Sequence, residues 1–339
     1  MKSRIILLAA GVSLAITGFS TMAYAKTRLI VNCFWPPSHY VCTTLLPEWL
    51  DEVEKVTEGR VVGNIPPKSV APPPEQLASV EKGVVDAAVQ FNGLIGNRVK
   101  GPLVAMQPFV GSNDAAAMSQ ALWETTQKYY PDEFTTVHLA GQWVVSPAQL
   151  FSMTDTPITT LDDFKSRKIW ALPGPIAGMS KALGAGVVST PAVKSNEVIS
   201  TGVVDGHLGL GGDAIKAFQV IPYTKSMTRF SDPIYSTSFS FVINKDKWAE
   251  ISPEDQAAIM EISGSALGTK AGAAWDAIGV GVFAQFDEFG ISIVDIDPAL
   301  ETAFKEAAKP ITAKWLDEAG PNSAEALEFY KKRVVELSK

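Results

Sequence analysis

The chain has 339 residues, of which 36 are acidic and 29 basic, so its formal net charge at pH 7 is −7. This balance excludes a nucleic-acid-binding role, because phosphate backbones require clustered lysines and arginines. The length exceeds what one hydrophobic core usually serves, so we expect two lobes.

The first 25 residues have the pattern of a secretory signal peptide. Lys2 and Arg4 precede an apolar stretch over 5–19, and Ala23-Tyr24-Ala25 supplies the small residues of a cleavage site. A membrane span needs roughly 20 apolar residues, which neither this stretch nor any later one reaches. We therefore expect a mature protein that begins at Lys26, lies in the periplasm and does not insert into the membrane.

The chain has two cysteines, Cys33 and Cys42, nine residues apart. In an oxidising compartment they could form a disulfide. The alternative is two buried thiols that act as small hydrophobic side chains, and we expect this because a long chain does not depend on one short loop closure. No second Cys/His pair has zinc-ligand spacing, so we expect neither a metal nor a cofactor.

Strand and helix patterns alternate along the first hundred residues. The predicted elements are a strand over 27–34, a rigid loop over 35–40, a helix over 45–56, a strand over 60–65, a proline-rich loop over 66–74, a helix over 75–82 and a strand over 87–91. This order indicates an α/β fold with a largely parallel sheet.

A four-residue sequence occurs twice. Gly83-Val84-Val85-Asp86 recurs as Gly202-Val203-Val204-Asp205, and each copy follows a predicted short helix and precedes a strand. The glycine suits the left-handed position that ends a helix. We infer that both lobes use the same supersecondary unit.

Between and after the two copies, further elements are predicted. They are a short helix capped by Thr160 and Asp163, a strand over 168–172, a strand over 239–244, a final strand over 291–294 and two amphipathic helices from 297 onwards.

The strongest helix signal is Ser252-Pro253-Glu254-Asp255, with a hydroxyl cap, a proline at the first position and acids in the first turn. The pattern continues to Phe289, which would make a single helix about 55 Å long. Gly264, Gly268 and Gly272 fall on one face, where they would permit close packing. Such a helix could lie along both lobes.

Several segments, taken in order, resemble the solute-binding proteins of TRAP transporters. They are Trp35-Pro36-Pro37-Ser38-His39, the helix over 49–60, both Gly-Val-Val-Asp units, Leu161-Asp162-Asp163-Phe164-Lys165 with Lys168-Ile169, Leu183-Gly184-Ala185, and Asn244-Lys245-Asp246-Lys247-Trp248 before the long helix. The resemblance implies a two-lobed α/β periplasmic-binding-protein fold with a long helix spanning both lobes. It also implies a small-molecule ligand, separate TRAP membrane subunits and uptake driven by an ion gradient.

We expect a monomer with the following division. Residues 1–25 form the signal peptide, 26–143 with about 224–252 the first lobe, about 144–223 with about 253–300 the second lobe including a bridging helix over 253–289, and 301–339 the C-terminal helices that pack on the lobes.

The chain departs from the family at one position that bears on the ligand. The family usually has Arg after the Lys-Ile pair, where it forks onto a ligand carboxylate, and this chain has Trp170. Tryptophan faces attract ammonium groups, and Asp213 near the expected cleft could supply a negative partner. We therefore predict a small amine, quaternary ammonium or zwitterion of the ethanolamine, choline or betaine type. In the alternative, Trp170 only packs, and Arg98 or Arg167 holds a carboxylate or sulfonate.

Other candidate ligand-binding residues lie at strand ends and at the expected crossover between lobes, where α/β folds gather ligands. They are Trp35, His39, Phe91, Asn92, Trp143, Tyr235 and Phe239. Trp275, in a helical pattern, is predicted to pack.

A secreted hydrolase is the competing class. The chain has three histidines and no H-E-x-x-H pair, and Gly178-Met179-Ser180-Lys181-Ala182 lacks the final glycine of a nucleophile elbow. We therefore expect no catalytic residues. A binding protein for an ABC transporter is a further alternative, which the long bridging helix disfavours.

Overall fold

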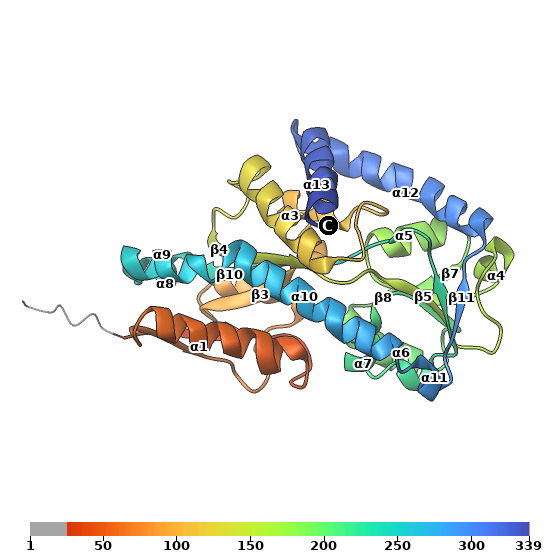
Figure 1. Cartoon of the computed structure of the whole chain (residues 1–339), viewed down its shortest axis with the longest axis horizontal. Helices are drawn as coiled ribbons and strands as arrows, with labels where there is room; N and C mark the ends of the chain where they lie inside the picture. Colours follow the sequence, from red (N-terminus) through yellow and green to blue (C-terminus); the bar gives the residue numbers. More distant parts are fainter. Residues whose placement is uncertain (1–25, 339) are drawn as a thin grey trace, which may run out of the picture.

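The computed structural model describes residues 26–338, so the predicted signal peptide lies outside the described residues. Two lobes, each built on one β-sheet, lie side by side with a long helix running across both (Figure 1). The first sheet has the order β2-β1-β3-β10-β4. Its strands are β1 (Thr27–Asn32), β2 (Val61–Asn64), β3 (Ala87–Phe91), β4 (Val137–Val144) and β10 (Ser238–Asn244).

The second sheet has the order β11-β9-β5-β8-β6-β7. Its strands are β5 (Gln149–Ser152), β6 (Lys168–Ala171), β7 (Gly186–Val188), β8 (Gly206–Leu210), β9 (Ser226–Arg229) and β11 (Ser292–Asp295). The helices of the two lobes are α1 (Leu46–Val56), α2 (Gln76–Glu81), α3 (Ala115–Tyr129), α4 (Leu161–Lys165), α5 (Pro175–Ala182), α6 (Ser195–Ile199), α7 (Gly212–Ala217) and α8 (Lys245–Ala249).

The prediction of a largely parallel sheet is confirmed, since in each of the two described sheets all strands but one run in the same direction. β10 runs antiparallel to both β3 and β4, and β5 runs antiparallel to both β8 and β9. The chain crosses between the lobes from β4 to β5 and returns from β9 to β10. Because β9 belongs to the second sheet, the return lies after Arg229 and not near residue 224 as expected.

The repeated sequence forms the same structure in both lobes. Gly83 and Gly202 have φ angles of +66° and +68°, the left-handed geometry expected after a helix. The Asp86 carboxylate accepts a hydrogen bond from the backbone N–H of Ile30 in β1 at 2.7 Å, and the Asp205 carboxylate accepts one from Lys168 in β6 at 2.9 Å. Each aspartate thus fastens its strand to the neighbouring parallel strand.

Cys33 and Cys42 form a disulfide, with Cα atoms 5.7 Å apart. The expectation of two free buried thiols is therefore wrong. The bridge closes a short loop directly after β1, and a loop of this size contributes about 2–3 kcal/mol in the chain-entropy description. Sequence spacing could not decide this pairing, because it depends on how the loop folds back.

The predicted long helix is divided into α9 (Pro253–Glu261), α10 (Gly264–Phe283) and α11 (Phe286–Phe289). The first break lies at Ser263 and Gly264. Gly264 has a φ of +52°, and the Ser263 hydroxyl accepts a hydrogen bond from the Trp49 indole at 2.9 Å.

The central helix α10, about 30 Å long, still bridges the lobes. It packs on α3 and β4 of the first lobe and on α7 of the second. Because α9 contacts α1, and Asp255 pairs with Arg60, residues 253–261 belong with the first lobe and not with the second as predicted.

The glycines of α10 serve close packing, as predicted. A Cβ atom at Gly268 would overlap the carbonyl oxygen of Gln142, and one at Gly272 would overlap that of Ala115. On the other lobe, a Cβ atom at Gly212 would lie 2.9 Å from the carbonyl oxygen of Gly279. The helix therefore touches both lobes through its backbone.

The C-terminal helices α12 (Pro298–Glu318) and α13 (Ser323–Leu337) complete the chain. α12 packs on α4 and α5 of the second lobe, and α13 packs on α3 of the first.

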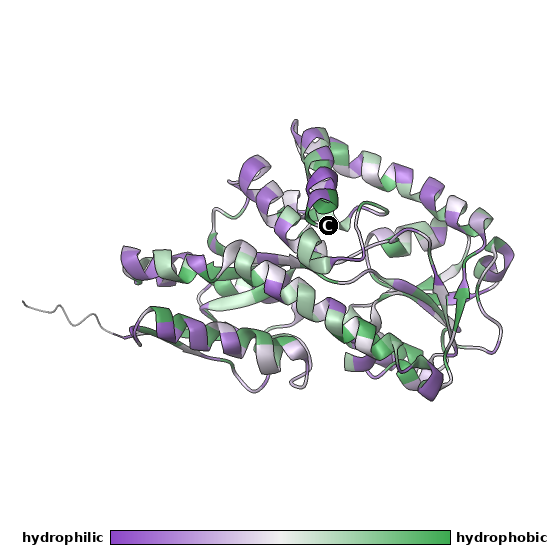
Figure 2. Cartoon of the chain, viewed as in Figure 1, coloured by the Kyte–Doolittle hydropathy of each residue, from purple (hydrophilic) through white to green (hydrophobic). Residues whose placement is uncertain are grey.

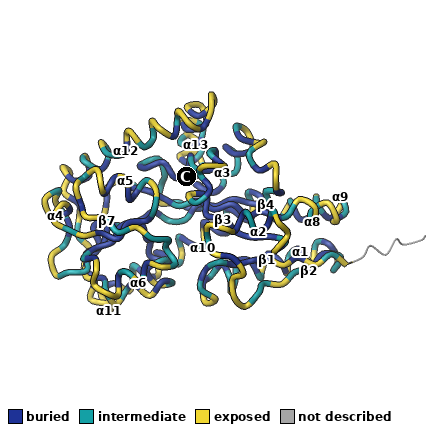
Figure 3. Tube along the Cα trace, turned by 180° about the vertical axis from the view of Figure 1, so that it is seen from behind, coloured by how far each residue is buried: buried dark blue, intermediate teal, exposed yellow. Residues whose placement is uncertain are grey.

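Apolar and polar residues alternate along α12, whereas α10 is apolar over most of its length (Figure 2). The outer turns of α12 are exposed and the strands of both lobes are buried (Figure 3). Among the described residues, no helix combines the length and apolar character needed to cross a bilayer.

We expect Gly268→Ala or Gly272→Ala to lower the free energy of unfolding by about 2–3 kcal/mol or more, because the new methyl group has no room against backbone atoms. Gly281→Ala on the same helix is the matched control. Nothing lies within 4 Å of its Cβ position, so this change should stabilise by up to about 1 kcal/mol. Chemical denaturation measures both, and equal effects would contradict close packing.

Candidate functional site

A cavity of about 80 Å³ lies where the two lobes, the crossover segment and α10 meet. Its walls are mostly apolar. The first lobe contributes Phe34, Trp35, His39, Pro73, Phe91, Leu94, Thr237 and Phe239; the crossover contributes Val145, Ser146 and Ala148; the second lobe contributes Leu172, Pro173, Pro191–Val193, Gly209–Gly211, Asp213, Ala214 and Phe218; and α10 contributes Trp275.

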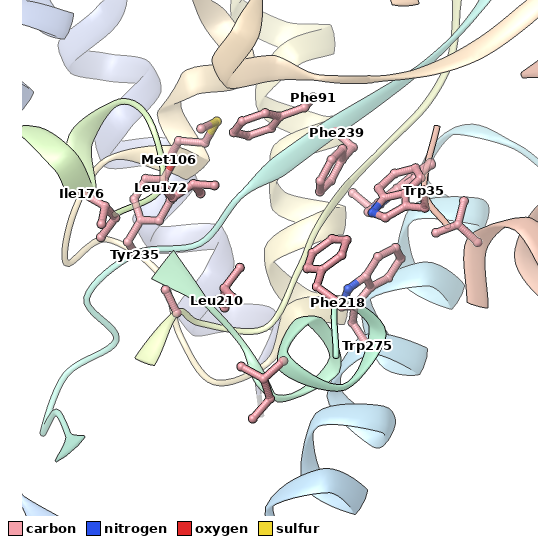
Figure 4. Packing of buried hydrophobic residues seen from close by; sticks show 14 of the residues in the cluster. Trp35, Phe91, Met106, Leu172, Ile176, Leu210, Phe218, Tyr235, Phe239 and Trp275 are labelled. Carbon is pink, nitrogen blue, oxygen red and sulfur yellow. The ribbon is translucent and has the colours of Figure 1, made fainter. Parts of the chain in front are cut away.

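Aromatic rings from three parts of the chain gather at this cavity. Trp35 stacks on Phe34 with ring centroids 3.9 Å apart and lies 5.1 Å from Phe239. Trp275 lies 6.4 Å from Trp35 and 6.5 Å from Phe239, nearly parallel to the latter. Figure 4 shows the rings of Trp35, Phe239, Trp275 and Phe218 turned toward a common space. Ring faces at these distances offer stacking surfaces to a flat or cationic group.

The strand ends explain this gathering. Phe91 ends β3 and lies opposite Phe239 in the antiparallel register with β10. Trp35 follows β1, and Leu172 follows β6. Trp35, Phe91 and Leu172 thus lie at or beyond the carboxyl ends of parallel strands, where open α/β sheets bind ligands, and Phe239 joins them because β10 runs antiparallel to β3.

His39 is held as a neutral hydrogen-bond donor. Burial lowers the pKa of its imidazole to about 4. Its Nδ1 accepts a hydrogen bond from the backbone N–H of Val41 at 3.2 Å, so the neutral ring carries its hydrogen on Nε2. That N–H is available to a ligand.

Asp213 is the one acidic side chain in the lining. It is 8% exposed, and its Oδ2 accepts a hydrogen bond from the Trp275 indole N–H at 2.7 Å. Burial raises the pKa of this carboxyl to about 6, and the nearby Asp276 acts in the same direction. In the described part of the chain, the lining contains no lysine or arginine. Asp213 therefore has a neutral hydrogen-bond donor but no lining cation.

The crossover segment is fastened to α10 beside this site. The Ser146 hydroxyl donates to Asp276 Oδ1 at 2.7 Å, and the backbone N–H of Ala115 donates to Oδ2 at 2.7 Å. Consecutive residues of α10 therefore contact both lobes, since Trp275 bonds Asp213 and Asp276 bonds the start of α3.

The structure brings five of the nine predicted site residues to the cavity wall. These are Trp35, His39, Phe91, Asp213 and Phe239.

The other four do not line it. Trp170 is 0% exposed, and its indole donates to the Thr190 hydroxyl at 2.8 Å, so its face lies in the core of the second lobe. The Asn92 side-chain amide donates to the Ser238 hydroxyl and accepts from the Ser240 hydroxyl, both in β10. Trp143 and Tyr235 are buried behind the wall.

The alternative arginines do not reach the cavity either. Arg98 pairs with Glu81, and Arg167 donates to the Thr154 hydroxyl and the Thr156 carbonyl. An anion in the cavity would therefore rely on neutral donors.

Sequence reasoning missed several wall residues, chiefly Trp275, Phe218 and Phe34. Trp275 packs as predicted, but one part of it also faces the cavity. A signal was available, because Trp275 follows Gly268 and Gly272 at helical spacing on the face of α10 that meets the lobes. Among the described residues, no group of three or more His, Cys, Asp or Glu side chains is placed to hold a metal ion.

The raised pKa of Asp213 predicts a specific pH dependence. A carboxyl whose pKa is about 6 when folded and near 3.8 when unfolded contributes stability below about pH 4 that is lost as the pH rises through 6. Asp213→Asn removes this contribution. Relative to the wild type, the variant should therefore gain about 2–3 kcal/mol of unfolding free energy between pH 4 and pH 7. Denaturation at several pH values measures this, and a difference between variant and wild type that stays constant with pH would contradict it.

Comparisons with known proteins identify relatives along almost the whole chain. The model of the family described as bacterial extracellular solute-binding protein, family 7 (DctP), matches residues 31–318. The outer membrane transporter protein TsaT of Comamonas testosteroni is 34% identical over 313 residues, which cover 90% of this chain and 91% of that protein.

Solved structures with the same fold are also found. A TRAP periplasmic solute-binding protein from Bordetella bronchiseptica, with bound (R)- and (S)-mandelate, is 30% identical, with a TM-score of 0.83 over 91% of this chain and 99% of that one. A marine metagenome TRAP solute-binding protein specific for aromatic acid ligands, in complex with 3-hydroxybenzoate, has a TM-score of 0.84 over 93% of this chain and 100% of that one. At 23% identity, this second likeness supports the fold alone.

Proposed function

The chain belongs to family 7 of the bacterial extracellular solute-binding proteins, the periplasmic solute-binding proteins of TRAP transporters, and we propose that it captures a small organic molecule in the aromatic cavity between its lobes. The observation that carries this proposal is the cluster of rings contributed by the first lobe, the second lobe and α10. A ligand that touches rings from both lobes favours their closure, because it gains contacts only when the lobes meet.

Capture is followed by delivery, without chemical change, to the membrane subunits of the transporter, which take up the ligand by means of an ion gradient. The targeting segment before Lys26 would bring the protein to the periplasm. Recovery of the bound ligand unaltered after prolonged incubation is the expected result for a binding protein, and turnover would contradict it.

For the ligand's charge, we propose a cation or zwitterion, of the amine or quaternary ammonium type predicted from the sequence. The residues that support this ligand charge differ from those predicted from the sequence, because Trp170 lies outside the cavity. Trp35 and Trp275 instead offer ring faces, and Asp213 offers a carboxylate that no lining lysine or arginine neutralises. A buried carboxylate without a counter-ion favours a cationic guest.

An aromatic acid is the second candidate. The Bordetella bronchiseptica protein at 30% identity holds mandelate, which carries both a phenyl ring and a carboxylate. In this chain such an anion would accept hydrogen bonds from neutral donors such as the His39 Nε2–H and the Thr237 hydroxyl. It would also require a proton on Asp213.

A screen of phenyl compounds matched in size and differing in charge separates the candidates. We expect benzyltrimethylammonium to raise the melting temperature by about 5 °C when its concentration is 100 times Kd, because ligand binding stabilises the native form by about 2.7 kcal/mol under that condition. Benzyl alcohol should have a smaller effect, and choline, betaine and ethanolamine complete the set. Stabilisation by mandelate or benzoate alone would favour the second candidate, and no stabilisation by any ring compound would contradict the aromatic cavity as the ligand site.

Two single substitutions test which residues contact the ligand. Phe239→Ala removes a ring from the cavity wall and should weaken binding of the stabilising compound by about tenfold or more. Trp170→Phe is the matched control, since the hydrogen bond to Thr190 and the ring atoms that it removes lie outside the cavity. Its affinity should stay within about twofold of the wild type, while its unfolding free energy falls by about 2–3 kcal/mol, because a hydrogen bond and buried ring volume are both lost. Isothermal titration measures the affinities, and the reverse order would restore Trp170 as a contact.

A further inference from the structure

The loop closed by the disulfide carries one wall of the ligand cavity. Residues 33–42 lie between β1 and α1, and the bridge joins their two ends. Three residues inside the loop, Phe34, Trp35 and His39, line the cavity. Their rings form a stack, with Trp35 lying 3.9 Å from Phe34 and 5.2 Å from His39 between ring centroids.

The backbone hydrogen bonds of this wall are local. The His39 N–H donates to Pro36 O at 2.8 Å, and the Cys42 and Thr43 N–H groups donate to His39 O at 2.9 and 3.0 Å, at the start of the helical segment that follows. Among the described backbone hydrogen bonds, none joins residues 34–38 to another element. Apart from the chain itself and the packing of its rings, the disulfide is therefore what ties the far end of the wall to β1.

A second hollow lies on the other side of Trp35. This groove, of about 460 Å³, is lined by both cysteines and by residues of α1, β2 and the loop after β2, including Leu50, Asp51, Gly63 and Lys68. Trp35 lines the groove as well as the cavity. Trp35 thus borders two spaces, and a displaced side chain would have room to move into the groove.

We infer that the Cys33–Cys42 disulfide positions one wall of the cavity for ligand capture. It holds the Trp35 side chain against the cavity. The inference rests on the proposed function only in that the cavity is the ligand site. When the bridge is opened by a reductant, which leaves two thiols and the oxidised reductant, the far end of the loop is no longer tied to β1, and only local hydrogen bonds and ring packing hold the wall. Trp35 then shifts toward the groove, and the stacking surface offered to the ligand is lost.

The first test needs no ligand. Protein labelled with 5-fluorotryptophan is followed by fluorine NMR before and after reduction with TCEP, with the Trp35 signal assigned through Trp35→Phe. Because the chain has no other cysteine, reduction acts on this bridge alone. The Trp35 resonance should move and broaden, whereas that of Trp315, a buried indole on α12, should not. A Trp35 resonance that stays unchanged when two free thiols are titrated would overturn the inference.

The second test measures capture. Affinity for benzyltrimethylammonium is compared for oxidised protein, TCEP-reduced protein and Cys33→Ser/Cys42→Ser, with far-UV circular dichroism as the check on folding. We expect both the reduced protein and the double variant to bind at least fivefold more weakly, and TCEP to have no effect on the double variant. If the double variant does not fold, the reduced wild type decides. A shifted Trp35 resonance with unchanged affinity would reject the role of the disulfide in ligand capture. Failure of the probe to bind any form of the protein would count against the proposed function. In that case the NMR result still decides whether the disulfide positions the loop.

Discussion

The backbone contact of α10 with both lobes is the constraint from which the site follows. Gly268 and Gly272 bring the helix against the backbone of β4 and α3, and Gly212 of the second lobe reaches the helix from the other side. Because the backbone of α10 lies this close to both lobes, the residues that follow Gly272 on the same face of the helix border the space between the lobes. Trp275 therefore becomes part of the cavity wall and bonds Asp213, while Asp276 fastens the crossover through Ser146.

The two lobes are variations on one unit, and this explains where the cavity lies. In each lobe, an aspartate after the repeated glycine and valines fixes the start of a parallel strand, so the strands of both sheets end facing the same gap. The chain crosses between the lobes before β5 and again before β10, and each of these strands runs antiparallel to its neighbours, which makes each sheet mixed. A ligand in the gap consequently contacts segments of both lobes, which a hinge motion of the lobes would bring together.

The chemistry of the cavity follows from what surrounds Asp213. Its carboxyl is buried, bonded to one indole and raised in pKa, while the lining in the described residues offers no lysine or arginine. Such a group either accepts a cation or takes up a proton when an anion binds. The burial of Asp213 therefore accounts both for the charge preferred in the ligand and for the pH dependence of stability. The aromatic rings supply the remaining contact area for the ligand.

The sequence by itself determined most of the elements, the repeat and the family, and it placed five of the nine predicted ligand-binding residues where the cavity wall lies, because these depend on local periodicity, capping and position at a strand end. Only the tertiary structure decided the mixed sheets, the division of the long helix at Ser263, the disulfide and the place of Trp170. Each of these depends on which distant segments meet: Trp49 reaches Ser263, Cys42 folds back on Cys33, and Thr190 takes the Trp170 indole inside the core. Such partners lie far apart or across a loop, where spacing along the chain carries no information about contact.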